Sequence, residues 1–449
     1  MALGGGAFIA QNKTLPGAYI NFISAARATA SLGDRGVVAA PFALDYGPEG
    51  RIFGLSASEI AGKSLALFGY AYTDEKMRFA RELFANARTV YFYRLDGGTA
   101  AECTYAKAKY GGTRGNALTL VVEADADSPG QFVVQVLLNG SVVDRRSGAA
   151  NTDDLKESPY LDWKPGVALE AMAGMAFTGG TDTPATGEAH TRFLDAVETC
   201  GVNVICCPAD SAPDPVLQKL YAQRVKTLRD ERGVKVQCVV WNYAADHEGV
   251  INVKNAVVGA AGGSAAFNPC DIVYWVAGVA AGTPVNRSAL NKIYDGEYLL
   301  DVDYTQLELE NAIKNGEFAF HHVGNASDGS PVVRVLADIN SLITVTAEKG
   351  DDFKENQTIR VLDQIGNDIA ALFANKYLGV VPNDHDGRVS LWADIVAHHR
   401  QLEAARAIED FDSADVTVEQ GNTRKSVVVS DKVRPVNAMA QLYMTVVVA

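Results

Sequence analysis

The sequence lacks the features that mark membrane, secreted and nucleic-acid-binding proteins. Its longest apolar run, Ile272 to Ala281, is too short to span a bilayer, and no basic segment precedes an apolar one at the N-terminus. The six cysteines lie in apolar segments without C-x-x-C spacing, which predicts reduced core thiols. The formal net charge of −14 argues against a general nucleic-acid or anionic-membrane binder. We therefore expect a protein made in the cytoplasm, with no membrane insertion and no nucleic-acid partner.

Motifs for catalysis and metal binding are also missing. The run Gly111 to Asn116 lacks the spacing of a phosphate loop and lies between two β segments, and no G-x-S-x-G elbow is present. His321 and His322 fall on a predicted strand, so they point to opposite faces. His398 and His399 fall on a predicted helix, where they diverge by about 100 degrees. The sequence predicts no catalytic residue, no metal ligand and no cofactor.

The sequence does contain alternating strand and helix patterns, at a length of 449 residues that allows several domains. A strand at 35–41, helices at 55–69 and 74–86, and a strand at 89–95 give a β-α-α-β order. From about residue 99 to 178, short strands alternate with tight turns.

Within that β-rich stretch, Asn139-Gly140 is a strong signal for a two-residue hairpin. Continuous apolar runs at 202–206 and 234–241 then predict buried parallel strands. The expected fold class is an α/β core of mixed α+β type with an inserted all-β domain.

These patterns divide the chain into six parts. They are an N-terminal strand arm and linker (1–34), the first part of the α/β core (35–98), an inserted β-rich outer domain (99–178), the second part of the core (179–345), a C-terminal α/β domain (346–432) and a terminal strand (433–449). The C-terminal domain is expected to hold helices at 351–379 and 390–409 and strands at 415–419 and 425–430.

Both ends of the chain show the period-2 alternation of a β-strand. An open edge of such composition needs a partner. Either each end pairs within its own domain, or both are donated to sheets of neighbouring copies. The residues concerned are Ala18, Tyr19, Ile20 and Phe22 near the N-terminus and Leu442, Tyr443, Met444 and Val446 near the C-terminus.

Five segments, taken in order, carry a resemblance to a known family. They are Pro16-Gly17-Ala18-Tyr19-Ile20, Tyr110-Gly111-Gly112-Thr113-Arg114-Gly115-Asn116-Ala117, Phe177-Thr178-Gly179-Gly180-Thr181-Asp182, Arg360-Val361-Leu362-Asp363 and Val433-Arg434-Pro435-Val436-Asn437-Ala438-Met439. Together they resemble the contractile tail sheath protein family of bacteriophages and phage-tail-like injection particles.

The resemblance implies a structural role without enzymatic activity or a cofactor. Sheath subunits of this family stack as six-subunit rings around an inner tube and contract to drive the tube through a target envelope. Their N- and C-terminal strands are exchanged with neighbouring subunits. The partners implied are further copies of the chain, the inner tail tube protein, and baseplate and tail terminator proteins. The subunit would be made in the bacterial cytoplasm and assembled into a tail or particle.

The family also places its tube-facing elements in the C-terminal section. The densest basic cluster on predicted helices there is our candidate for contact with an acidic tube surface, and the alternative is an ordinary solvated helix face. Its members are Lys376, Arg388, His398, His399, Arg400 and Arg406.

Two other functional classes stay open from the residues alone. The chain could be an α/β enzyme, with an active-site crevice at the ends of the strands predicted at 202–206 and 234–241. It could also be a static tube or capsid subunit.

Overall fold

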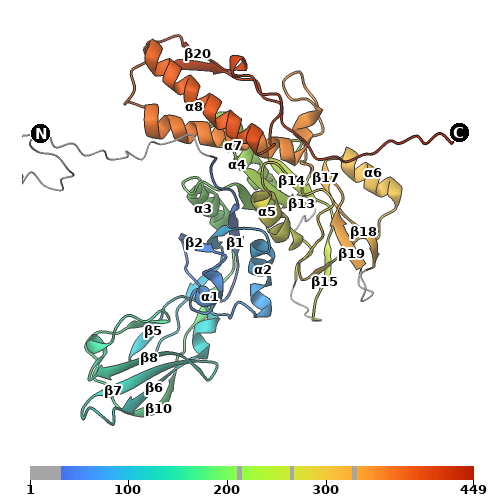
Figure 1. The fold of residues 1–449 in the computed structure, drawn as a ribbon. Coiled ribbons are helices and arrows are strands. Elements are labelled where there is room, and N and C mark those ends of the chain that lie inside the picture. The colour runs from blue at the N-terminus through green and yellow to red at the C-terminus, as the bar shows by residue number, and fades with distance from the viewer. Residues whose placement is uncertain (1–31, 210–214, 263–266, 326–330, 449) are drawn as a thin grey trace, which may run out of the picture. The chain divides into compact units, whose positions relative to one another are not determined.

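The computed structural model describes residues 32–209, 215–262, 267–325 and 331–448 (Figure 1). The described chain forms two compact units. The larger unit comprises residues 33–367, 405–409 and 434–448, and the smaller comprises Leu32, 368–404 and 410–433. Ala18, Tyr19, Ile20 and Phe22 lie outside the described residues.

A seven-stranded sheet forms the centre of the larger unit. Its spatial order is β17-β14-β13-β12-β1-β3-β2, and only β2 runs antiparallel to its neighbour. The strands are β1 (Val37–Phe42), β2 (Ile52–Ser56), β3 (Thr89–Arg94), β12 (Val204–Cys206), β13 (Gln237–Trp241), β14 (Val250–Val253) and β17 (Glu317–Phe318).

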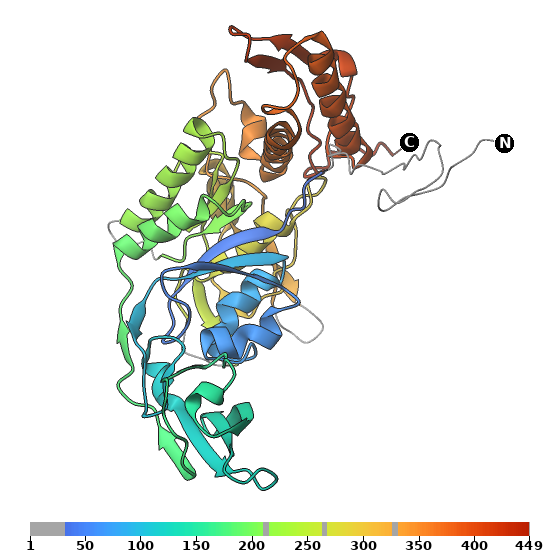
Figure 2. The same ribbon diagram turned by 90° about the vertical axis from the view of Figure 1, so that its left-hand side faces the viewer.

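Helices cover both faces of this sheet, because successive strand residues point to opposite sides. Val38 and Phe42 of β1 pack in one core with α1 (Ile60–Phe68), α2 (Arg78–Phe84) and α5 (Ile272–Gly282). Ala39 packs in a second core with α3 (Gly187–Val197) and α4 (Val216–Lys226). Figure 2 shows α3 and α4 in green on the opposite side of the sheet from α2 in blue. The α/β prediction for this part is confirmed.

An all-β domain is inserted between β3 and α3. Its main sheet has the order β10-β6-β7-β8 and covers a core of its own. The strands are β6 (Leu118–Ala124), β7 (Phe132–Leu138), β8 (Ser141–Ala149) and β10 (Met172–Ala176), accompanied by the pairs β5 (Ala106–Ala108) with β9 (Leu161–Trp163) and β4 (Gly97–Thr99) with β11 (Thr181–Thr183). Asn139 and Gly140 both adopt positive φ, 49° and 79°, as the predicted hairpin requires.

The larger unit is completed by short elements beyond the sheet. They are the hairpins β15 (Val257–Ala260) with β16 (Tyr298–Leu300) and β18 (Phe320–Asn325) with β19 (Pro331–Val335), and helix α6 (Gln306–Lys314). None of the helices in the described ranges is long and apolar enough to cross a membrane.

The smaller unit packs two helices against a two-stranded hairpin. Helix α7 (Asn356–Leu372) contributes residues to both units, and α8 (His385–Ala404) lies wholly in the smaller one. The hairpin pairs β20 (Thr417–Gln420) with β21 (Val427–Ser430). The buried core joins residues of α7, α8 and the hairpin region: Leu372, Tyr377, Leu391, Ile395, Val396 and Val416.

One predicted element needs correction. The helix expected from Leu55 begins at Ile60, because residues 52–56 pair with β3 as a strand. Residues 440–448, predicted as one strand of a ladder, pair with no strand among the described residues, and their donation to a neighbouring copy stays a prediction.

Candidate assembly site

The C-terminal segment is hydrogen-bonded to the rest of the larger unit through its residues 434–438. The amide of Glu409 donates to the carbonyl of Arg434 (3.0 Å), and the amide of Val436 donates to the carbonyl of Ala407 (3.0 Å). These two bonds make a short antiparallel bridge around Ile408. The bridge fixes the start of the segment by backbone groups, so it constrains the direction of the chain.

The first turn of α7 completes this anchor. The side chain of Asn437 exchanges hydrogen bonds with the hydroxyl of Thr358 (3.2 and 3.3 Å), and the amide of Ala438 donates to the side-chain oxygen of Gln357 (3.1 Å). Gln357 and Thr358 are buried. Within the segment Val433 to Met439, singled out in the sequence, residues 434–438 are therefore a fixed base.

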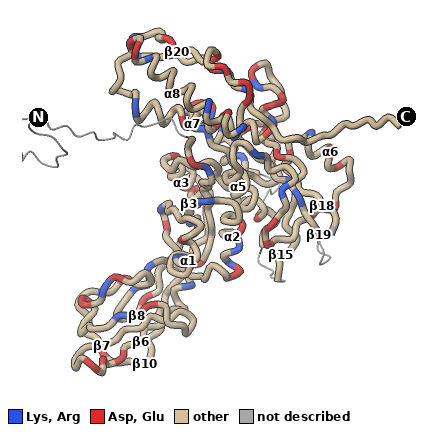
Figure 3. Tube along the Cα trace, viewed as in Figure 1, with Lys and Arg blue, Asp and Glu red and all other residues tan. Residues whose placement is uncertain are grey.

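Beyond that base the chain becomes an exposed apolar arm, defined here as residues 439–448. Leu442 and Tyr443 expose 86% and 87% of their surface, and Met444 and Val446 expose 74% and 70%. Figure 3 shows the arm as an uninterrupted tan trace, because it carries no Lys, Arg, Asp or Glu. Without a partner, the apolar side chains of this arm stay in contact with water, and the free energy that their burial would contribute is not gained.

The β20–β21 hairpin offers the complementary feature. Each strand pairs only with the other among the described residues, so both outer edges keep unpaired backbone groups. Val418 and Val427 pack toward the core of the smaller unit, whereas Val428 lies on the other face and is 55% exposed. Among the described residues, the hairpin therefore has two edges without a neighbouring strand.

Two motif segments of the sequence meet at the neck of the inserted domain. Thr113 donates to Asp182 from its amide (2.8 Å) and its hydroxyl (2.6 Å). Asn116 donates to the carbonyl of Gly180 (2.9 Å) and accepts from its amide (2.8 Å). The segments flank the domain in sequence, so these bonds close its entrance and exit against each other.

Glycine is required at this neck. Gly112 has φ +128°, and a Cβ there would lie 1.9 Å from the carbonyl oxygen of Asp45. Only a residue without Cβ allows the two backbones to approach so closely. The Gly-rich run is thus a packing device, in agreement with its lack of phosphate-loop spacing.

The motif on α7 supplies two buried ion pairs. Arg360 lies 2.6 Å from Asp338, and Asp363 accepts two hydrogen bonds from Arg229 (2.7 and 2.8 Å). Asp338 and Arg229 were not identified from the sequence, because nothing local marks residues 22 and 134 positions away as partners. The pairs join α7 to the sheet region of the larger unit.

Comparison with known proteins decides the family. Three phage tail sheath models match consecutive parts of the chain: the beta-sandwich domain at 96–182, the central domain at 183–341 and the C-terminal domain at 348–449. The crystal structure of a sheath tail protein from Desulfitobacterium hafniense is 33% identical and covers 95% of this chain and 99% of its own, with a TM-score of 0.78. The chain belongs to the phage tail sheath family.

Two further relatives cover this sheath protein almost completely. The sheath tail protein of Listeria innocua is 32% identical, covers 90% of this chain and 93% of its own, and has a TM-score of 0.79. Protein XkdK of the phage-like element PBSX of Bacillus subtilis is 33% identical over 99% of both chains.

The residues predicted to face the tube are not one exposed cluster in the sheath protein. His398 and His399 are fully buried and hydrogen-bond to Asp368 and Asp431, so their placement on an exposed basic face is corrected. The two carboxylates account for this, because they hydrogen-bond to ring nitrogens that burial removes from water.

The other four members differ among themselves. Lys376 forms an ion pair with Asp394 (2.5 Å), and Arg388 donates to the backbone and side-chain oxygens of Asn383 (3.1 Å each). Arg400 is exposed. Arg406 is exposed as well but belongs to the larger unit.

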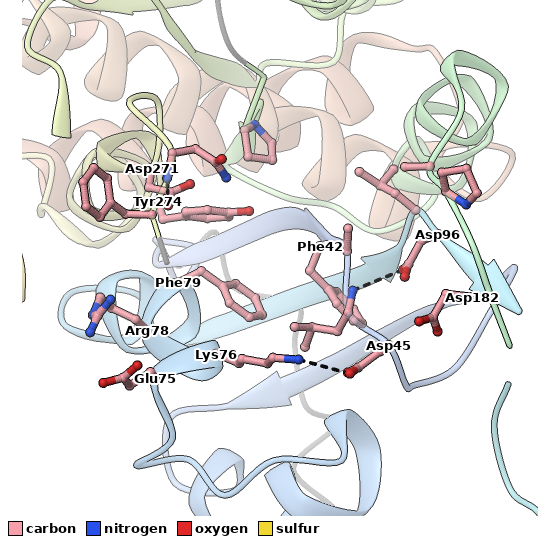
Figure 4. Close-up of a pocket in the computed structure, with 18 of the residues that line it drawn as sticks. Phe42, Asp45, Glu75, Lys76, Arg78, Phe79, Asp96, Asp182, Asp271 and Tyr274 are labelled. Atoms are coloured by element: carbon pink, nitrogen blue, oxygen red, sulfur yellow. Dashed lines mark hydrogen bonds and ion pairs between the residues drawn. The ribbon is translucent and has the colours of Figure 1, made fainter. Parts of the chain in front are cut away.

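The sheath protein has a crevice where an α/β enzyme would hold its substrate. It lies beyond the carboxyl ends of β1, β3 and β12, where the strand order reverses, and has a volume of about 760 Å³ (Figure 4). The carboxylates of Asp45, Asp96, Asp182 and Asp271 each accept hydrogen bonds from protein groups, such as Lys76 to Asp45 at 3.0 Å. The described residues that line it include no Ser, Cys or His. These hydrogen bonds hold the loops around the crevice together.

Among the residues that the structure describes, Asp230, His247 and Glu248 have a spacing that could suit a metal ion. His247 Nδ1 accepts from the amide of Gly249 (2.9 Å), so its Nε2 carries the hydrogen that faces Asp230 (3.2 Å). Lys349 lies 2.9 and 3.0 Å from the two oxygens of Glu248. A cation and a protonated nitrogen thus fill the positions that an ion would need.

Proposed function

We propose that this protein is the repeating subunit of a contractile tail sheath, which forms stacked rings of six around an inner tube. The observation that carries the proposal is the exposed apolar arm, which has no ladder partner among the described residues. The β20–β21 hairpin of a second copy is the acceptor that suits it, because its outer edges are open and partly apolar. Ala18, Tyr19, Ile20 and Phe22 remain the predicted donor at the other end.

The energetics favour a firm link. A donated strand of five residues makes roughly four to six backbone hydrogen bonds, each worth about 1 kcal/mol net. Burial of Leu442, Met444 and Val446 adds about 1.5–3 kcal/mol for each side chain that is fully buried. Such a junction persists while the bodies of the subunits rearrange.

Contraction is then a change of packing between rigid bodies that stay linked. The neck bonds and the two buried ion pairs of α7 support rigidity within the larger unit. The extended sheath would be metastable, and the contracted sheath would bury more interface between cores. The role is structural rather than catalytic, in keeping with the occupied carboxylates of the crevice.

Contact with an acidic inner tube is assigned to Arg388 and Arg400 of α8. Arg400 is exposed and Arg388 is half-buried. An exposed ion pair is weak, at about 0.2–1 kcal/mol, so many such contacts can hold the tube and still release it. Baseplate and terminator proteins would bind the two ends of the polymer.

A single substitution in the arm tests the assembly. Thr445→Pro removes a backbone donor from a strand ladder, whereas Thr445→Ala keeps it. We expect Thr445→Ala to form hollow cylinders in negative-stain electron microscopy and Thr445→Pro to stay monomeric, with equal melting temperatures because Thr445 is exposed. Cylinders of equal length from both variants would refute strand donation.

A further inference from the structure

The exposed apolar arm follows closely on a strand of its own hairpin. β21 ends at Ser430, the base of the C-terminal segment occupies residues 434–438, and the arm starts at residue 439. An arm held in a neighbouring copy would be under tension whenever two subunits move apart. If nothing held the chain between the arm and β21, the backbone would pass that tension directly into the strand.

β21 is poorly suited to carry such a force. It pairs with β20 over four residues, and among the described residues no further strand supports either of them. An isolated two-stranded hairpin is marginally stable at best. A pull on the end of β21 loads the pair of Ser430 and Thr417 first and the other pairs in turn, so the hairpin would open one pair at a time. The acceptor for a neighbouring arm would then be lost.

The base fastens the chain before it reaches β21. The amide of Ala438 donates to Gln357 in the first turn of α7 (3.1 Å). In the same turn, Thr358 holds the side chain of Asn437. The antiparallel bridge to residues 407–409 comes next along the chain. Force that enters from the arm therefore meets each of these attachments before it meets the hairpin.

The antiparallel bridge also takes the hairpin out of the path of the force. Ile408 and Pro435 lie opposite each other, so residues 409–434 form a closed loop that contains both β20 and β21. Proline is tolerated at this position, because the two hydrogen bonds of the bridge involve the neighbouring residues Arg434 and Val436. A pull on the arm crosses the bridge and leaves the loop unloaded.

The first turn of α7 is joined in turn to the interior of the larger unit. Asn356, which is buried, donates to Asp338 (3.1 Å) and to the carbonyl of Ile339 (2.9 Å). It accepts from the side chain of Gln237 in β13 (3.1 Å). The force that the base takes up therefore passes through α7 toward the seven-stranded sheet.

We propose that the base isolates the acceptor hairpin of each subunit from tension on the subunit's own arm. This role of the base rests on the strand donation proposed above, because only a donated arm is pulled. Force from the arm enters α7 and the larger unit, and β20 and β21 stay paired. A subunit can therefore hold one neighbour by its arm and accept an arm from another at the same time.

Stretching single full-length molecules with optical tweezers, with one handle at each end of the chain, tests the base without any assembly. Loss of the bridge and opening of the hairpin should lengthen the molecule by about 80–90 Å, the extended length of residues 409–434. We expect Thr358→Val to shorten the lifetime of the closed bridge under constant force about tenfold, because it removes a hydrogen bond. Thr358→Ser keeps the hydroxyl and should match the wild type.

Two further measurements keep the test decisive if Thr358→Val folds poorly. Opposed residues of an antiparallel pair lie close enough for a disulfide, so Ile408→Cys combined with Pro435→Cys should lock the bridge. The oxidised form should lose the lengthening step, and the reduced form should regain it. Amide exchange of β20 and β21 in unstretched molecules should be the same in the wild type and both Thr358 variants, because the base acts only under tension.

Three results would each overturn the proposal. They are equal lifetimes for Thr358→Val and Thr358→Ser, a lengthening step that survives oxidation, and faster exchange of the hairpin in unstretched Thr358→Val. None of these measurements involves a second copy. Such a result would leave the Thr445 test of strand donation unaffected, and a failure of donation would not alter the measured lifetimes.

Discussion

Arg360 and Asp338 form an ion pair sealed from water. Arg360 Nη2 lies 2.6 Å from Asp338 Oδ2, and the side chains are 0% and 3% exposed. Burial alone would raise the pKa of Asp338, but the Arg360 guanidinium and the hydrogen bonds of Ala289 and Asn356 hold it below its ordinary value. The carboxylate therefore contributes stability above its unfolded pKa, and that contribution is lost as the pH falls through the lower folded value.

Removing one partner of this pair should be strongly destabilising. Arg360→Met leaves a buried carboxylate without its cation, so we expect the free energy of unfolding to fall by about 3–5 kcal/mol in urea denaturation. Arg192→Met, on the exposed face of α3, should change it by less than about 0.5 kcal/mol. A loss below about 1 kcal/mol for Arg360→Met would show that the pair does not hold α7.

A buried glutamate should give the protein a second pH dependence, of opposite sign. Burial raises the pKa of Glu82 to about 7, although Tyr294 and the amide of Glu297 donate to it. The folded state keeps the proton after the unfolded chain has released it. Stability should therefore decline between about pH 4.5 and pH 7, by roughly 3 kcal/mol from this group.

The variant Glu82→Gln isolates that contribution. Thermal unfolding at several pH values should show a flatter profile between pH 4.5 and 7 than the wild type, because the amide does not titrate. Glu188→Gln, a mostly exposed position on α3, should keep the wild-type slope. Parallel profiles for Glu82→Gln and the wild type would argue against a buried titrating carboxyl.

The neck of the inserted domain should tolerate no side chain at Gly112. Gly112→Ala places a Cβ against the Asp45 carbonyl, while Gly130→Ala, also at positive φ, meets no atom within 4 Å. The extra loss of stability in Gly112→Ala measures the clash together with the backbone strain at φ 128° and ψ 161°, a region that essentially only glycine adopts. We expect about 1–3 kcal/mol in denaturant titration, and faster proteolysis between the inserted domain and the core. Equal losses would mean that the neck can shift.

The proposed contact with the inner tube should respond to charge. Arg388→Glu combined with Arg400→Glu should raise severalfold the tube concentration needed for half-maximal sheath assembly, because each exposed pair contributes about 0.2–1 kcal/mol. Co-sedimentation with purified tubes measures this, and added salt should reduce the difference. Arg192→Glu, elsewhere on the surface, is the control for each single substitution, because Arg388→Glu, Arg400→Glu and Arg192→Glu each change the charge by two units. Assembly by the double variant at wild-type tube concentrations would remove these residues from the interface.

Local patterns in the sequence determined most elements of the fold. Continuous apolar runs marked β12 and β13, and Asn139-Gly140 marked the β7–β8 hairpin, because burial and turn geometry leave a signature within a few residues. The order of five motif segments was enough for the family. The sequence did not show why the four segments that the structure describes are needed, since each of them contacts residues far away in the chain.

Only the tertiary structure decided which charged side chains are buried and whether the C-terminal segment pairs with another described strand. The sequence pattern predicted His398 and His399 to be surface cations on a helix. In the structure they are buried and hydrogen-bond to Asp368 and Asp431, which lie 30 and 32 positions away in the sequence. Leu442 and Met444 alternate like a strand, yet they form no ladder within the described chain. The physical reason is the same in both cases: periodicity reports which side of an element is apolar, whereas pairing depends on what the folded chain, or another copy of it, brings alongside.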